Sequence, residues 1–252
     1  LMSIDPSVGG NYAILGQSEN DFIVGGLGDD TIDAGIDAGA DIVMGDHAHA
    51  VFDLDGTNSI LRTLETSEIF YAGFDSIMTG PGPDWVMGGS QGDTIDTGIG
   101  DDRDVMIGDN ARATFDAQGI LEQITSTSPG VGGTDIMTSD GGSDIAIAGR
   151  GFDTVNTVET ATGNDERDIV LGDSGTLTFA VIGAQSMLRQ ATSTDHNEGH
   201  SDTLDVGNGD NIVISGSGDD TLTSGDGIDL VLGDNGVINL DETTGSLDLT
   251  SL

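Results

Sequence analysis

The stretch GGLGDDTID, residues 25–33, shows the sequence pattern from which the fold of this chain can be predicted. Three glycines precede Asp30, and an isoleucine follows that aspartate two places later. Similar strings are TGPGPDWVM (79–87), GGSQGDTID (88–96) and SGDGIDLVL (224–232). Glycine lets the backbone turn through positive φ, and the residues after the aspartate can form a very short strand. A turn with one short strand buries its apolar side chain only against another copy, so the repetition predicts a β-solenoid.

Aspartate returns along nearly the whole chain, often every nine residues, within a longer unit that recurs at intervals of 63, 64 and 61 residues. Aligning four units gives five columns, and eighteen of the twenty positions are aspartates. In column order they are Asp75, Asp135, Asp202; Asp21, Asp84, Asp144; Asp30, Asp93, Asp153, Asp220; Asp41, Asp104, Asp168, Asp229; and Asp46, Asp109, Asp173, Asp234. Tyr12 and Asn211 fill the other two positions, where we expect weak or absent metal sites.

These turns bring together the oxygen ligands that Ca²⁺ prefers, whereas Zn²⁺ would need Cys or His. Carboxylates of all eighteen aspartates are candidate ligands, together with nearby glycine carbonyls. The candidate turn glycines, expected at φ > 0, are Gly26, Gly28, Gly80, Gly82, Gly149, Gly151, Gly216, Gly218, Gly225 and Gly227. The fifth column always follows the fourth by five residues. Since Gly-Asp is also a common turn former without metal, both explanations of the fifth column stay open.

The strings resemble the GGxGxDxUx nonapeptide of the RTX, or hemolysin-type, calcium-binding repeats, where U is a large apolar residue. GGLGDDTID (25–33) matches every fixed position, and GGSQGDTID (88–96) misses one glycine. The resemblance implies an all-β chain, a right-handed parallel β-roll that binds several Ca²⁺ ions. It also implies export from a Gram-negative-type bacterium by a type I pathway, with folding outside the cell.

Composition favours folding that depends on calcium. The formal net charge is −39, with 37 Asp against 8 Glu. So much like charge opposes compaction, and a chain this poor in aromatic residues would usually be disordered. Disorder, however, does not require an aliphatic residue two places after each aspartate. We therefore expect Ca²⁺ to remove the repulsion and to stabilise only the folded state.

A second pattern predicts one protruding β-hairpin in each unit. Apolar residues alternate from Ala48 to Leu54 before Asp55-Gly56, with counterparts near Gln118-Gly119, Ile182-Gly183 and Thr244-Gly245. We expect the arms to lie against the solenoid, against each other or against a neighbouring chain, since a lone hairpin is marginal in water. Their apolar faces are candidates for a protein contact, or they merely thicken the core. Extra residues such as Thr160 to Arg167 should bulge out of the coil.

One continuous solenoid, 1–252, is expected, with units of approximately 1–56, 57–119, 120–183 and 184–252. The predicted narrow core is formed by Ile32, Val43, Val86, Ile95, Val155, Val170, Leu222 and Val231. Both ends fall in phase with the repeat, which favours a window from a longer array. The sequence has no cysteine and no run of apolar residues that predicts a membrane span. These features fit a secreted protein of a bacterial surface or extracellular matrix.

Several functions are disfavoured. Six basic residues make nucleic-acid binding improbable, and no catalytic grouping stands out, so we expect no enzyme. His47, His49, His196 and His200 are expected in solvated segments more than in a zinc site. A stiff calcium-binding array of a surface, matrix-fibre or adhesin protein is favoured, with self-assembly through the arms or binding to cell-surface components. The alternative is the calcium-triggered folding and export segment of an RTX toxin, lipase or protease. Thr31, Thr94, Thr154 and Thr221 share one column, but one threonine in each unit is too sparse for ice binding.

Overall fold

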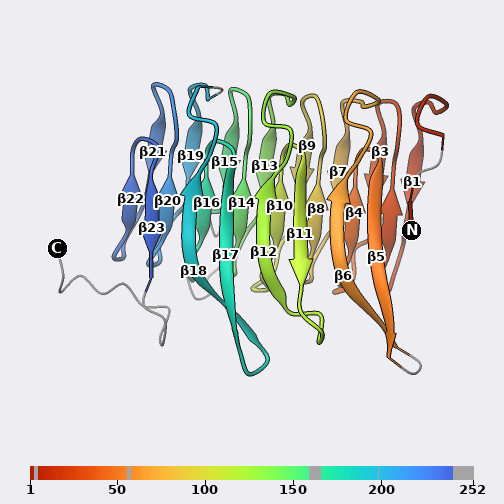
Figure 1. Cartoon of the computed structure of the whole chain (residues 1–252), viewed down its shortest axis with the longest axis horizontal. Coiled ribbons are helices and arrows are strands. Elements are labelled where there is room, and N and C mark those ends of the chain that lie inside the picture. The colour runs from red at the N-terminus through yellow and green to blue at the C-terminus, as the bar shows by residue number, and fades with distance from the viewer. Residues whose placement is uncertain (3–4, 56–57, 159–165, 198, 241–252) are drawn as a thin grey trace.

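The chain folds into a parallel β-roll covered on one side by a third sheet (Figure 1). The computed structural model describes residues 1–2, 5–55, 58–158, 166–197 and 199–240. Strands are the only regular elements in these ranges, since no helix occurs there. The expected all-β solenoid is therefore confirmed.

One parallel sheet, here called the open sheet, has an outer face that is exposed to solvent. Its order is β1-β3-β7-β9-β13-β15-β19-β21. The strands are β1 (Ala13–Leu15), β3 (Thr31–Asp33), β7 (Ser76–Met78), β9 (Thr94–Asp96), β13 (Ile136–Thr138), β15 (Thr154–Asn156), β19 (Thr203–Asp205) and β21 (Thr221–Thr223). In most of them one apolar side chain points inward between two outward residues, as in β9, where only Ile95 is buried.

The other parallel sheet, here called the covered sheet, is buried on both faces along most of its length. Its order is β2-β4-β8-β10-β14-β16-β20-β22. The strands are β2 (Phe22–Val24), β4 (Ile42–Met44), β8 (Trp85–Met87), β10 (Val105–Ile107), β14 (Ile145–Ile147), β16 (Ile169–Leu171), β20 (Ile212–Ile214) and β22 (Leu230–Leu232). All three residues of each strand are apolar, as parallel strands with two buried faces require.

The core between the two parallel sheets consists of the middle residues of their strands. Ile32, Val43, Val86, Ile95, Val155 and Val170 are buried there, as predicted. The prediction was wrong for Val231, which is 38% exposed, and Leu222 is only partly buried. Both lie in the last strands, β22 and β21, which have a hydrogen-bonded neighbour on one side only.

The third sheet, here called the hairpin sheet, is antiparallel and has the order β23-β18-β17-β12-β11-β6-β5. Its strands are β5 (Ala48–Asp55), β6 (Asn58–Thr66), β11 (Ala111–Phe115), β12 (Leu121–Ser126), β17 (Gly175–Ile182), β18 (Gln185–Ser193) and β23 (Val237–Asn239). Leu64, Ile124 and Leu177 are fully buried and belong to one cluster with Met87 and Ile107 of the covered sheet. The hairpins thus pack their apolar faces on the roll, and their tips extend beyond it (Figure 1).

The hairpins also pair with each other across unit boundaries. β6 pairs with β11, β12 with β17, and β18 with β23. The arms therefore lie both against the roll and against each other, which are two of the three expected placements. Their apolar faces are buried by these contacts and are not free for a partner. The reversals near Gln118-Gly119 and Ile182-Gly183 are confirmed, with Gly119 at φ 81° and Gly183 at φ 66°. The expected reversals at Gly56 and Thr244-Gly245, and most of Thr160 to Arg167, lie outside the described residues.

Candidate calcium sites

The aspartates of the first four columns form two ladders, one along each edge of the roll. In each ladder a backbone N–H of one turn donates to Oδ1 of the aspartate in the next stacked turn. Asp30 donates to Asp75 at 2.8 Å, and Asp75 donates to Asp93 at 2.7 Å. The open-sheet ladder, which precedes open-sheet strands, contains Asp30, Asp75, Asp93, Asp135, Asp153, Asp202 and Asp220. The covered-sheet ladder contains Asp21, Asp41, Asp84, Asp104, Asp144, Asp168, Asn211 and Asp229.

The second carboxylate oxygen of many ladder aspartates is buried without a hydrogen-bond partner. This holds for Oδ2 of Asp30, Asp75, Asp93, Asp135, Asp153, Asp202 and Asp220, which is every aspartate of the open-sheet ladder. In the covered-sheet ladder it holds for Asp21, Asp84 and Asp144. Native proteins pair nearly all buried polar groups, because an unpaired one is destabilising. The row of unpaired carboxylate oxygens is therefore a row of candidate cation ligands.

Carbonyl oxygens of neighbouring turns converge on the same places. A methyl group at Gly25 would contact both Oδ2 of Asp30 and the carbonyl oxygen of Gly45. The equivalent position in other turns is Gly45, Gly88, Gly108 and Gly172 along the open-sheet ladder, and Gly16 along the covered-sheet ladder. A carboxylate oxygen and a carbonyl oxygen repel each other unless a cation lies between them. The residues present therefore fit Ca²⁺, which takes oxygen ligands from both groups.

The electrostatic setting explains why a cation would matter. Burial raises the pKa of several ladder carboxyls, because a charged group loses its hydration inside the protein. It raises the pKa of Asp84 and Asp144 to about 6, of Asp75 and Asp153 to about 7, of Asp104 and Asp135 to about 8, and of Asp202 to about 9. Neighbouring carboxylates add repulsion; Asp153 acts on Asp135 in this way. Bound Ca²⁺ would reverse both effects.

The expected positive φ is found at most of the candidate glycines, and their role as carbonyl ligands stays a prediction. Gly26, Gly28, Gly80, Gly82, Gly149, Gly216, Gly218 and Gly227 all have φ between 86° and 150°. Gly151 and Gly225 do not have positive φ, so that expectation was wrong for them. At these two positions space explains the glycine, because a side chain would collide with the carbonyl oxygen of Gly133 or with Asn208. The prediction also missed glycines such as Gly25 and Gly88, although their place five residues before a ladder aspartate was visible in the sequence.

The fifth column lies outside both ladders, at the base of each hairpin. Asp46 accepts hydrogen bonds from the backbone N–H groups of Gly73 at 3.0 Å and of Ser90 at 2.7 Å. Asp109 accepts from Gly133 and Arg150 in the same way, and Asp173 accepts from Ser217. These bonds tie the start of a hairpin to turns that come much later in the chain. They supply a structural role of the kind expected for a metal-free Gly-Asp turn, and a ligand role stays a prediction.

Carboxylates alone do not form a metal cage. Within the described ranges, no group of three or more His, Asp or Glu side chains could together hold a metal ion. Each ion would therefore depend on one or two ladder carboxylates and on backbone carbonyls. The histidines form no zinc site there either, and His47 is buried rather than solvated, with Nε2 lying 3.2 Å from the carbonyl oxygen of Pro6.

Each aspartate position of a ladder is here called a rung. Substitution of Gly88 by alanine should weaken calcium binding at one rung of the open-sheet ladder, that of Asp93. The new methyl group would occupy the space between Oδ2 of Asp93 and the carbonyl oxygen of Gly108. Overpacking of this kind destabilises by about 1–3 kcal/mol. Calcium titration and thermal melting in calcium would measure both effects. Gly130→Ala is the matched control, because a methyl group there has no neighbour within 4 Å. If the two variants bind and melt alike, Gly88 has no role at the site.

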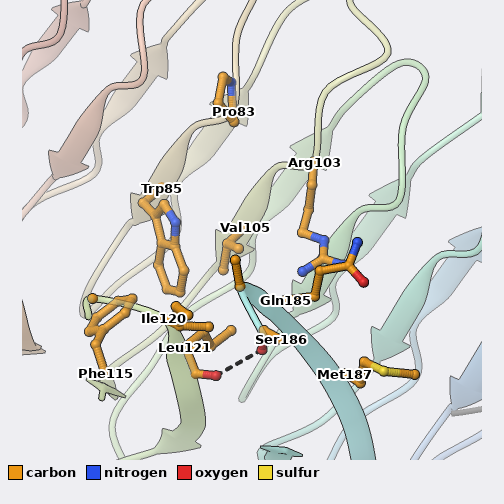
Figure 2. A pocket seen from close by; sticks show the side chains of 12 residues that line it. Pro83, Trp85, Arg103, Val105, Phe115, Ile120, Leu121, Gln185, Ser186 and Met187 are labelled. Carbon is orange, nitrogen blue, oxygen red and sulfur yellow. Dashed lines mark hydrogen bonds between the residues drawn. The ribbon is translucent and has the colours of Figure 1, made fainter. Parts of the chain in front are cut away.

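A groove of about 560 Å³ lies where the second hairpin (β11 and β12) and the third hairpin (β17 and β18) meet the edge of the covered sheet. Figure 2 shows Trp85 and Arg103 on the roll, Ile120 on the second hairpin, and Gln185 on the third. The ring centroids of Trp85 and Phe115 lie 5.2 Å apart. Ser186 on the third hairpin donates a hydrogen bond of 2.8 Å to the carbonyl of Leu121, which ties two units together beside the groove.

Comparison with known proteins agrees with this geometry. A family model described as the RTX calcium-binding nonapeptide repeat matches four times, at residues 15–46, 71–104, 130–155 and 197–231. The copies cover half of the chain, and most of each hairpin falls between or after them. No curated protein and no solved structure matches the chain. The described residues contain no helix with the length and apolar character needed to cross a bilayer. The two aspartate ladders, their unpaired carboxylate oxygens and the four matches lead to one conclusion: this chain belongs to the RTX calcium-binding nonapeptide repeat family.

Proposed function

We propose that this chain is the calcium-stiffened structural segment of a secreted bacterial surface, matrix-fibre or adhesin protein, without catalytic activity. The observation that carries the proposal is continuity. Each of the three sheets is hydrogen-bonded through all four units, from β1, β2 and β5 to β21, β22 and β23. A repeat array in which every unit is bonded to its neighbours along three faces resists bending, and calcium in both ladders would stiffen its two edges.

The hairpin sheet is the surface best suited to contact other molecules. Its strands contain three of the six basic residues of the chain and only four of its 45 acidic residues. This surface therefore carries far less negative charge than the rest of the molecule, and it repels another acidic chain less strongly. The tips, which extend beyond the roll, carry exposed apolar residues such as Leu54, which is 80% exposed, and Ile182, which is 43% exposed. We propose that the tips, rather than the buried arms, make the contacts of an assembly.

Sedimentation of the calcium-loaded chain over a range of concentrations tests assembly through the tips. The wild-type protein should associate, and a Leu54→Ser/Ile182→Ser variant should sediment as a monomer. Ile136→Ser is the matched control, because this apolar residue is 49% exposed on the open sheet, away from the tips. If all three proteins stay monomeric at every concentration, the chain is a rod that does not assemble through its tips.

The open sheet provides a weaker argument for another function. Its first outward column carries hydroxyl groups in six of eight strands, at Thr31, Ser76, Thr94, Thr154, Thr203 and Thr221. The column is denser than the sequence predicted, because each unit contributes two strands to the sheet. The next outward column, however, includes the carboxylates of Asp33, Asp96 and Asp205. This uneven, charged face does not favour ice binding over the structural role.

A further inference from the structure

Asn211 is the one non-aspartate among the described rungs of the covered-sheet ladder, and it is completely buried. Its Oδ1 accepts the backbone N–H of Asp168 at 2.9 Å, as the ladder aspartates do for their neighbours. Its backbone N–H donates to Oδ1 of Asp229 at 3.1 Å. The ladder therefore passes through Asn211 without interruption.

The other half of the Asn211 side chain does what no carboxylate can do. Nδ2 donates to the carbonyl oxygens of Asn208 at 2.8 Å and Val206 at 3.2 Å, and Gly207 follows at 3.5 Å. All three carbonyls belong to the turn that leads into Asn211. An amide nitrogen is a donor with two hydrogens, whereas a carboxylate oxygen at this position would face the same carbonyls as a second acceptor.

We propose that Asn211 forms a metal-free rung, in which its amide nitrogen takes the place that Ca²⁺ takes at aspartate rungs. The inference rests on the proposed assignment of calcium to the ladders. At Asp84 and Asp144 the second oxygen is buried without a hydrogen-bond partner of good geometry, and the hydroxyls of Thr79 and Ser139 are the nearest side-chain donors beside it, so it is free to bind a cation. At Asn211 the protein supplies the donor itself, and the turn closes without an ion.

The neighbouring rung extends this metal-independent stretch. Thr157 donates its hydroxyl to Oδ2 of Asp168 at 2.6 Å. Two successive covered-sheet rungs therefore have donors from the protein itself. At Asp168 the Thr157 hydroxyl pairs with the second carboxylate oxygen, and at Asn211 the side-chain amide pairs with the turn carbonyls. The open-sheet ladder has no such donors at this level, since Oδ2 of Asp153 and Oδ2 of Asp202 are both buried without a hydrogen-bond partner. Calcium would thus order the two edges unequally here, with the covered-sheet edge able to close first at limiting calcium.

Asn211→Asp and Asp144→Asn make a reciprocal test. Calorimetric titration should show that Asn211→Asp binds one more Ca²⁺ ion than the wild type, and that Asp144→Asn binds one fewer. Asn211→Asp should also need a severalfold higher calcium concentration to reach half of its folded circular dichroism signal, because it loses the built-in donor. Asn211→Ala, which keeps neither donor nor charge, should bind the wild-type number of ions and yet fold less readily at limiting calcium.

The outcomes separate the inference from the assignment on which it rests. If Asp144→Asn loses an ion but Asn211→Asp gains none, the metal-free rung is overturned and the calcium ladders stand. If Asp144→Asn loses no ion, the covered-sheet assignment fails and the inference fails with it. If Asn211→Asp does not fold, Asn211→Ala decides: wild-type folding of that variant at limiting calcium would overturn the inference.

Discussion

Removal of calcium at neutral pH is expected to unfold the roll completely. The chain carries a net charge of −39, and its ladders bring buried carboxylates close together along both edges. Without a cation, the unpaired Oδ2 atoms and the repulsion between them oppose folding. Binding to the folded state alone stabilises it by about 2.7 kcal/mol per site when free calcium is 100 times Kd. A few such sites together are comparable to the whole stability of a typical domain, about 5–15 kcal/mol.

Circular dichroism during a titration with EGTA, followed by excess calcium, measures this effect. The β signal should disappear with EGTA and return with calcium. Magnesium at the same concentration is the control and should not restore it, because Mg²⁺ requires a tighter octahedral shell and gives up its water reluctantly. A chain that stays β-rich in EGTA would show that the hydrophobic core alone is sufficient.

The alternation of turns and strands was predictable because the repeat is local. Each string such as 88–96 contains its own turn and strand, and the buried Ile95 lies where the nonapeptide places its large apolar residue. Stacking then follows from the repetition itself. The ladder positions followed as well, since the same aspartate in each copy reaches the same edge.

The cover over one parallel sheet was less predictable, although the sequence held a signal. Strands after the second and fourth aspartate columns are apolar at all three positions, as in Ile145–Ile147, whereas strands such as Thr94–Asp96 expose their two outer residues. Uniformly apolar parallel strands indicate burial on both faces. The pairing of β12 with β17 depends on contacts between residues about 50 positions apart, as between Thr125 and Thr176, and no local pattern specifies it.

The residue type of Asn211 predicted a weak or absent metal site, but not that its amide nitrogen would close the turn. In the alignment it appears only as a position that lacks a carboxylate. Its significance comes from three carbonyl oxygens that the folded turn directs at Nδ2. Similarly, the hydrogen bonds of Asp46 join residues 27 and 44 positions away, so their geometry exists only after the turns have stacked.

Acidification is expected to have opposite effects on the calcium-free and calcium-loaded chains. A carboxyl whose pKa is higher in the folded state favours folding only while it is protonated. Its contribution is fully present below the unfolded value of about 3.9 and is lost as the pH rises through the folded value. Those folded pKa values run from about 6 for Asp84 to about 9 for Asp202. In EGTA, the β signal should therefore grow as the pH falls from about 8 to about 5.

With calcium present the direction reverses, because protons compete with Ca²⁺ for the same carboxylates and lower the affinity. The pH should stay above the isoelectric point of about 4.1, where precipitation would obscure the result. Asp135→Asn removes one charge permanently and should imitate protonation: in EGTA at about pH 8 it should favour folding, and in calcium it should weaken binding. Asp101→Asn changes an exposed aspartate outside both ladders and serves as the matched control. Equal responses of the two variants, or a calcium-free chain that loses β structure on acidification, would contradict the account of buried ladder carboxyls as the groups that calcium neutralises.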